Sequence, residues 1–229
     1  MPRNVAIFDD VEVLDFCGPF EVFSVAARLD GADAFDVYTV AEELRPIVAR
    51  GGLSVNPHST LGDCPTPDIV VVPGGYGARR EQHNRPVLDW IRNWSKRSEL
   101  TLSVCTGAAL FSKAGLLDGK KATTFHRYID ELQRITPKAT ILRNTRFVDN
   151  GQVITTAGIS AGIDGALHVV ANLRGEDVAQ QTAQHMEYDK WQPNQGLVVK
   201  AATPATAGAA LVDKSPAEKA KGSVRGRKK

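Results

Sequence analysis

One cysteine stands in a sequence context that suits a catalytic nucleophile. The segment Ser103-Val104-Cys105-Thr106-Gly107 places a thiol between small residues and joins a β-rich run to a helical pattern. Small neighbours are needed because a tight strand-to-helix turn brings backbone segments close together. We expect the pKa of the thiol to be lowered, because unpaired N–H groups and the dipole at a helix amino terminus stabilise a thiolate. The alternative is that Cys105 is a small buried apolar residue.

Two further segments are expected to end beside this turn. Asp15 follows the first strand in an apolar setting, where a carboxyl group can stay protonated and exchange a proton with a thiol. Gly74 and Gly75 follow the apolar run 69–73, and glycine there lets backbone N–H groups approach a ligand, as an oxyanion hole requires. The plainer alternatives are a helix N-cap for Asp15 and a loop turn for the glycines. Ligands of open α/β sheets bind beyond the carboxyl ends of strands, so these segments predict one site.

Short apolar runs alternate with helical patterns along most of the chain. Strands are expected at residues 5–8, 35–40, 69–73, 100–104, 139–142, 145–149 and 153–157. Helices are expected at residues 18–29, 86–97, 107–117, 125–135, 160–175 and 176–188, with a hairpin inside 45–58. This alternation predicts an α/β fold, namely a flavodoxin-like, doubly wound, mostly parallel sheet with helices on both faces.

Charge is distributed unevenly along the chain. The 229 residues are 42% hydrophobic and 24% charged, which is typical of globular proteins. Residues 201–229 hold seven basic and two acidic side chains and almost no large apolar residue, whereas residues 1–200 have a net charge of −3. We expect residues 1–200 to form one α/β domain and residues 201–229 to form a disordered basic tail. That tail is either a dispensable terminus or a tether to nucleic acid or another anionic surface.

Several classes of protein are excluded by what the sequence lacks. No apolar run approaches the roughly 18 residues of a membrane span, and acidic residues follow too early in MPRNVAIFDD for a signal peptide. Cys17, Cys64 and Cys105 are odd in number and far apart, which argues against a disulfide framework or a CxxC metal site. Neither the dinucleotide fingerprint GxGxxG nor a P-loop motif occurs. We therefore expect a cytoplasmic protein that requires neither metal nor cofactor.

Four segments together resemble a known superfamily. They are LDFCGPFEVF (14–23), DCPTPDIVVVPGG (63–75), SVCTGAALFSKAGLLDGKKATT (103–124) and AGISAGIDGALHVV (157–170). In this order they resemble the ThiJ/PfpI superfamily, part of the class I glutamine amidotransferase-like fold, over about residues 3–190. The resemblance is greatest to the isonitrile hydratase branch and to the sensor domain of AraC-type regulators, which shares that branch.

The resemblance implies roles for individual residues and a quaternary structure. It implies that Cys105 is the nucleophile, that Asp15 is its acidic partner, and that the amides of Gly75 and Thr106 contact an oxyanion. Thr106 stands where PfpI-type peptidases carry histidine, which argues against a protease. Members of the superfamily are usually homodimers, so a homodimer is expected here.

Three more residues are assigned to the pocket by the resemblance. Ser160 and Asp164 are expected to support it from a neighbouring helix start, with an N-cap and a helix-dipole partner as the equally supported alternatives. The branch normally has a histidine directly after the KATT stretch, but Phe125 stands there and His126 comes one position later. His126 is a candidate base if it faces the pocket.

The expected activity is that of a hydro-lyase acting on a small electrophile. In the isonitrile hydratase-like reaction, water adds to an isonitrile to give an N-substituted formamide through a thioimidate on Cys105. The alternatives are a glyoxalase-type enzyme acting on aldehydes and a non-enzymatic redox or small-molecule sensor. A DNA-binding regulator is disfavoured because only 29 residues follow position 200, although the basic tail could still contact nucleic acid. A glutamine amidotransferase is disfavoured because no convincing downstream His-x-Glu pair occurs.

Overall fold

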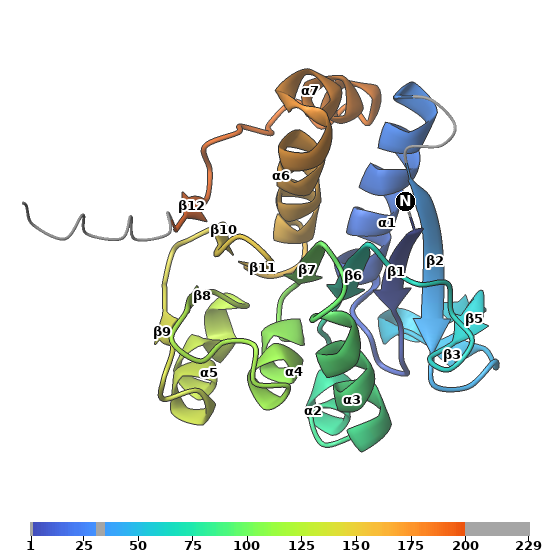
Figure 1. Cartoon of the computed structure of the whole chain (residues 1–229), viewed down its shortest axis with the longest axis vertical. Coiled ribbons are helices and arrows are strands. Elements are labelled where there is room, and N and C mark those ends of the chain that lie inside the picture. The colour runs from blue at the N-terminus through green and yellow to red at the C-terminus, as the bar shows by residue number, and fades with distance from the viewer. Residues whose placement is uncertain (1, 31–34, 200–229) are drawn as a thin grey trace, which may run out of the picture.

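A sheet of eight strands, most of them parallel, forms the centre of the molecule (Figure 1). The computed structural model describes residues 2–30 and 35–199. The strand order is β12-β10-β11-β7-β6-β1-β2-β5, and β10 pairs antiparallel with β11. The strands of this sheet are β1 (Pro2–Ala6), β2 (Asp36–Ala41), β5 (Ser59–Thr60), β6 (Ile69–Val72), β7 (Leu100–Ser103), β10 (Phe147–Asp149), β11 (Val153–Thr156) and β12 (Leu197–Val198). The predicted α/β fold class is confirmed.

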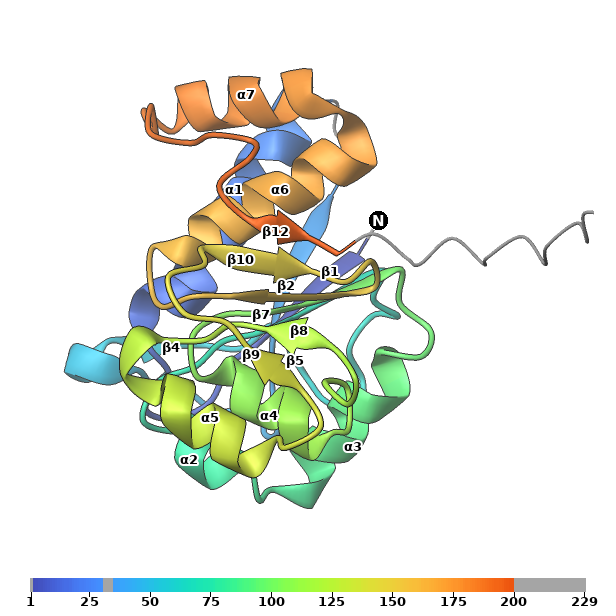
Figure 2. The same ribbon diagram turned by 90° about the vertical axis from the view of Figure 1, so that its left-hand side faces the viewer.

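Helices cover both faces of the sheet, as Figures 1 and 2 show. One layer consists of three helices that pack against one another: α1 (Val13–Leu29), α6 (Ala161–Arg174) and α7 (Glu176–His185). The other layer contains α2 (Ala78–Glu81), α3 (Arg85–Trp94), α4 (Gly107–Lys113) and α5 (Ile129–Ile135). Two single turns of 3-10 helix, η1 (Arg50–Gly52) and η2 (His126–Tyr128), lie in loops.

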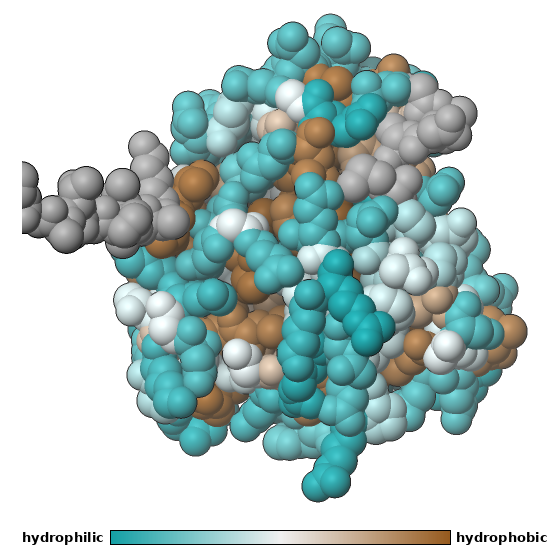
Figure 3. Space-filling view, viewed as in Figure 1, coloured by the Kyte–Doolittle hydropathy of each residue, from teal (hydrophilic) through white to brown (hydrophobic). Residues whose placement is uncertain are grey.

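Burial explains why these residues form these elements. All four residues of β6 are buried, as expected for a β-branched strand that is covered on both faces. In α3, Val87, Trp90 and Ile91 are buried at helical spacing, and Pro86 lies in the first turn, where it costs no hydrogen bond. The space-filling view in Figure 3 shows a mainly hydrophilic face with hydrophobic side chains gathered between the two helical layers.

Several boundaries differ from the prediction. Helix α1 begins at Val13 and contains Pro19, so Asp15 lies in its first turn and not ahead of a helix that starts at residue 18. The segment 139–142 contributes only β9 (Thr140–Ile141), which pairs with β8 (Lys121–Ala122) in a separate small sheet. The predicted hairpin inside 45–58 is confirmed as β3 (Ile47–Val48) with β4 (Ser54–Val55). The prediction for residues 201–229 lies outside the described residues.

No helix in residues 2–30 and 35–199 combines the length and the apolar character that crossing a membrane requires.

Candidate active site

Three strand ends converge on one point of the sheet. Strands β1, β6 and β7 are adjacent and parallel, so Asp15, Gly74 and Cys105 all follow carboxyl ends at the same edge. The Gly74 amide donates a hydrogen bond to Asp15 Oδ2 at 3.0 Å, and the charge of Asp15 raises the pKa of the Cys105 thiol. The structure therefore brings together the three segments that the sequence singles out.

Cys105 occupies a strained turn between β7 and α4. Its φ angle is 57°, in the left-handed region that L-residues other than glycine, asparagine and aspartate seldom adopt. The turn is fixed from both sides, because the Cys105 amide donates to Ala157 O at 3.1 Å and the Thr124 hydroxyl donates to Cys105 O at 2.6 Å. A Cβ on Gly107 would lie 2.2 Å from Val72 O, so the turn closes only with glycine there. The small residues around the thiol are thus a packing requirement.

Asp15 is fully buried and holds a raised pKa. Its Oδ1 accepts a hydrogen bond from the Ile159 amide at 3.1 Å, while Oδ2 is bound to the Gly74 amide. Burial raises the pKa of Asp15 to about 7 against these stabilising hydrogen bonds. Ile159 itself has a φ of 55°, so a second strained residue lies beside the carboxyl group. The site contains a carboxyl group that can hold or release a proton near neutral pH.

The thiol does not have the lowered pKa that the sequence predicts. Burial and the negative charge of Asp15 raise the pKa of Cys105, and the hydrogen bond from the Thr106 amide only partly opposes them. Cys105 is 5% exposed, and α4 has only seven residues. The helix-terminus argument fails because a nearby carboxylate and loss of water outweigh the amide dipoles of one short helix.

The amides expected to form an oxyanion hole are largely engaged. The Gly75 amide donates to Thr106 Oγ1 at 3.0 Å, and the Thr106 hydroxyl lies 3.2 Å from Gly75 O. The Gly74 amide is bound to Asp15, as described above. The Thr106 amide lowers the pKa of the Cys105 thiol. Of the donors predicted from the sequence, the Thr106 amide is therefore the one that acts on the sulfur.

A cavity of about 310 Å³ opens above Cys105. Its lining residues come from helix α2, the 3-10 turn η2 and loops: Glu12, Gly75, Tyr76, Arg79, Cys105, Thr106, Phe125, Arg127, Tyr128 and Ile159. Sequence reasoning identified Gly75, Cys105 and Thr106 but missed the aromatic and basic walls. Tyr76 directly follows the Gly-Gly pair, which is the sequence feature that could have identified it.

Three residues assigned to this pocket from the resemblance lie elsewhere. His126 is exposed and lines a different cavity, of about 390 Å³, while Phe125 and Arg127 on either side of it face Cys105. Ser160 Oγ accepts a hydrogen bond from Arg146 at 3.0 Å. The buried Asp164 pairs with the same Arg146. The expectation that these residues contact substrate is therefore not supported by their positions.

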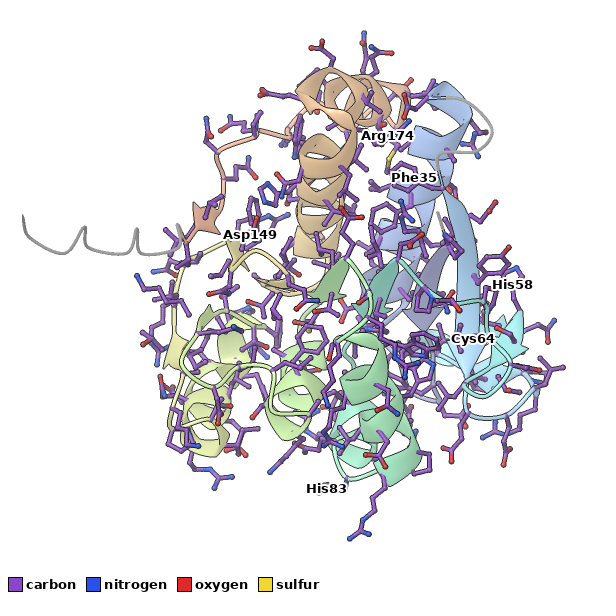
Figure 4. The ribbon with its side chains drawn as sticks, in the orientation of Figure 1. Phe35, His58, Cys64, His83, Asp149 and Arg174 are labelled. Carbon is purple, nitrogen blue, oxygen red and sulfur yellow. The ribbon has the colours of Figure 1, made fainter. Side chains whose placement is uncertain are left out.

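Other histidines and cysteines have structural roles. His168 stacks on Phe147 and shares a 2.8 Å hydrogen bond with Asp149, which Figure 4 labels near β10. His58 and Cys64 lie on the β5 side of the sheet in the same figure. Cys64 Sγ accepts a hydrogen bond from the Trp90 indole at 3.4 Å. Within the ranges 2–30 and 35–199, His, Cys, Asp and Glu form no group of three suited to a metal ion.

Sequence comparisons with known proteins find relatives over most of the chain. The model of the DJ-1/PfpI family matches residues 4–172. An isonitrile hydratase of Pseudomonas putida is 35% identical over 91% of this chain and 86% of its own length. The HTH-type transcriptional regulator CdhR of Pseudomonas aeruginosa is 28% identical over 80% of this chain, and the match spans about half of that regulator (54%).

Solved structures show the same fold. A ThiJ/PfpI family protein from Pseudomonas syringae superposes with a TM-score of 0.74 at 29% identity, covering 84% of this chain and 76% of that protein. Drosophila melanogaster DJ-1beta superposes with a TM-score of 0.71 at 20% identity, covering 81% of this chain and 97% of its own, and supports the fold alone.

Proposed function

The chain belongs to the DJ-1/PfpI family, and from that premise we propose that it is an isonitrile hydratase-like lyase with Cys105 as its nucleophile. The observation that carries the proposal is the pairing of a strained thiol at φ 57° with a fully buried carboxyl group whose pKa is about 7. Cys105 lines the cavity and the charge of the buried Asp15 acts on its thiol, which supports bond formation at sulfur coupled to proton transfer. The 35% identity to an isonitrile hydratase supports this choice of reaction.

The reaction begins with addition of the thiol to the terminal carbon of the isonitrile R–N≡C. The sulfur of Cys105 forms a bond to that carbon, the thiol proton passes to Asp15, and Asp15 returns a proton to the same carbon. The product of this step is the thioimidate R–N=CH–S–Cys105. A raised thiol pKa is compatible with this order, because the proton leaves sulfur as the new bond forms.

Water then releases the product. Asp15 accepts a proton from water as the oxygen adds to the thioimidate carbon, and passes that proton to the nitrogen to give R–NH–CH(OH)–S–Cys105. Collapse of this adduct breaks the C–S bond, returns the proton from the hydroxyl group to sulfur and leaves the formamide R–NH–CHO. We assign to the Thr106 amide the stabilisation of charge beside the reacting carbon, a role supported by its lowering of the Cys105 pKa.

The redox-sensor alternative is less well supported. Oxidation of a cysteine follows its thiolate fraction and its exposure, and Cys105 is 5% exposed with a raised pKa. An aldehyde can undergo the same attack by sulfur, so a glyoxalase-type activity remains the alternative chemistry of this site. The test is to offer both an isonitrile and an α-keto aldehyde to the protein.

Turnover of an aryl isonitrile tests the proposal. Formamide formation is followed in the ultraviolet for the wild type, Cys105→Ala and the matched control Cys64→Ala, whose thiol bonds Trp90 away from the site. We expect turnover in the wild type and the control and none in Cys105→Ala. Turnover that survives in Cys105→Ala would refute the assigned nucleophile, and turnover of the aldehyde alone would replace the proposed reaction.

We also propose that the enzyme is a homodimer, the assembly that the resemblance implies. Light scattering after size-exclusion chromatography measures this directly, and a mass equal to that of one chain would refute it.

A further inference from the structure

A guanidinium group at the rim of the Cys105 cavity is held between two aromatic rings. Arg79 Cζ lies 4.8 Å from the ring centroid of Tyr76 and 5.8 Å from that of Tyr128. All three residues line the cavity that contains Cys105. Arg79 is exposed and Tyr76 is 62% exposed, whereas Cys105 is 5% exposed. The charged group therefore lies at the open end of the cavity and the thiol at its closed end.

The contacts with the two rings leave the hydrogen-bond donors of Arg79 available. Cation–π contacts use the faces of a guanidinium plane, while its five N–H donors point outward in that plane. Among residues 2–30 and 35–199, no carboxylate lies within ion-pair distance of Arg79, and its guanidinium has no hydrogen-bond acceptor. Two rings thus hold in place a cation that has no protein anion to neutralise it.

The other charges around the cavity favour an anion at the rim. Arg127 also lines the cavity and is exposed, and Arg50, which is paired with Asp10, covers another part of Tyr76 at 4.5 Å. Glu12 is the opposing charge in the lining; it is partly exposed, and its charge raises the pKa of Asp15. Arg79 and Arg127 outnumber Glu12, so the charged side chains of the lining carry a net positive charge.

We propose that the substrates are isonitriles carrying a carboxylate at the end remote from the reacting carbon, and that Arg79 is the residue that selects them. This inference rests on the proposed function. An isonitrile is linear at nitrogen, so a carbon held at Cys105 directs the rest of the molecule towards the opening. Phe125 and Ile159 supply apolar walls for its middle portion. A carboxylate beyond them meets the guanidinium edge, where a planar fork binds it through two hydrogen bonds.

Paired substrates test the selection by Arg79. The probes are 4-isocyanobenzoate and 3-isocyanobenzoate, each compared with its uncharged methyl ester. We expect the wild type to favour at least one acid over its ester by about tenfold in kcat/KM, mainly through KM, the size expected for one charge-assisted contact. Arg79→Gln should abolish that preference, and Arg79→Lys should retain part of it because the charge remains.

Control variants and a binding measurement make the result decisive. Arg85→Gln removes an exposed arginine of α3 that does not line the cavity and should keep the full preference. Equal kcat/KM for acid and ester in the wild type would overturn the inference, as would loss of the preference in Arg127→Gln but not in Arg79→Gln.

If no isonitrile is turned over, the proposed function fails, and calorimetry then decides the inference separately. The probes in that case are 3- and 4-formamidobenzoate and their methyl esters, titrated into the wild type and Arg79→Gln. Tighter binding of an acid that depends on Arg79 supports an anion-selective rim, and equal binding overturns it.

Discussion

Replacing Asp15 by asparagine should change how the stability of the protein depends on pH. The pKa of Asp15 is about 7 in the folded protein and 3.8 in its ordinary state, because the side chain is fully buried. Between these values the folded protein holds a proton that the unfolded chain has released. The contribution of Asp15 to the free energy of unfolding is therefore greatest below pH 4 and falls as the pH rises towards 7. The amide introduced by Asp15→Asn cannot ionise, so this part of the pH dependence disappears in the variant.

The size of the effect follows from the pH interval. From pH 5 to pH 7 the folded protein holds about one extra proton, and each pH unit then changes stability by about 1.4 kcal/mol. Between pH 5 and pH 8 the wild type should lose about 3 kcal/mol more than Asp15→Asn. Urea unfolding followed by circular dichroism at both pH values measures the difference. Asp189→Asn, which replaces an exposed carboxylate, is the control and should behave as the wild type.

Comparing the change in stability between pH 5 and pH 8 in the two proteins removes an effect of the substitution that does not depend on pH. Both carboxyl oxygens of Asp15 accept hydrogen bonds from backbone N–H groups, those of Gly74 and Ile159. In the asparagine variant an NH2 group replaces one of these oxygens, so two donors then face each other. That mismatch costs about 1–3 kcal/mol at every pH. It cancels when the stability of a protein at pH 5 is compared with the stability of the same protein at pH 8. A difference between the two proteins below about 1 kcal/mol would show that Asp15 ionises normally and would refute the reasoning.

Two further substitutions test the packing of the site. Gly74→Ala places a Cβ 2.5 Å from both Thr106 N and Thr106 Oγ1, and should cost about 1–3 kcal/mol in thermal unfolding, whereas Gly62→Ala, with its nearest atom at 3.8 Å, should not. Arg146→Gln leaves the buried Asp164 without its cation and should lower the free energy of unfolding by about 3 kcal/mol. The double variant Arg146→Met with Asp164→Leu should recover most of that stability, and no recovery would contradict the pairing argument.

Local patterns were sufficient to predict the elements that position the nucleophile. Strands β6 and β7 are short runs buried on every residue, and the shortness of both runs, with the β-branched composition of β6, distinguishes them from helices. The turn after β7 was predictable because only small residues fit where Gly107 approaches Val72 O. The meeting of Asp15 with Cys105, 90 positions apart in the sequence, followed from parallel strands ending at one edge.

Features that depend on distant side chains were not predictable. Ser160 and Asp164 face Arg146, which lies on a neighbouring loop and takes up their hydrogen-bonding capacity. Strand β12 has two residues and exists through its pairing with β10, so its own sequence contains too little pattern to identify it. The start of α1 was placed too late because Gly18-Pro19 is typical of a helix boundary, yet both residues lie inside the helix.

The raised pKa of Cys105 constrains how the proposed enzyme works. A thiol that is ionised before substrate arrives would be open to oxidation, and burial beside Asp15 prevents that. The same carboxyl group, with a pKa of about 7, can take the thiol proton once an electrophile reaches sulfur. Nucleophile and base are thus activated together by the substrate. It follows that kcat/KM should depend on Asp15 at every pH, since a preformed thiolate would need no base and a buried thiol does.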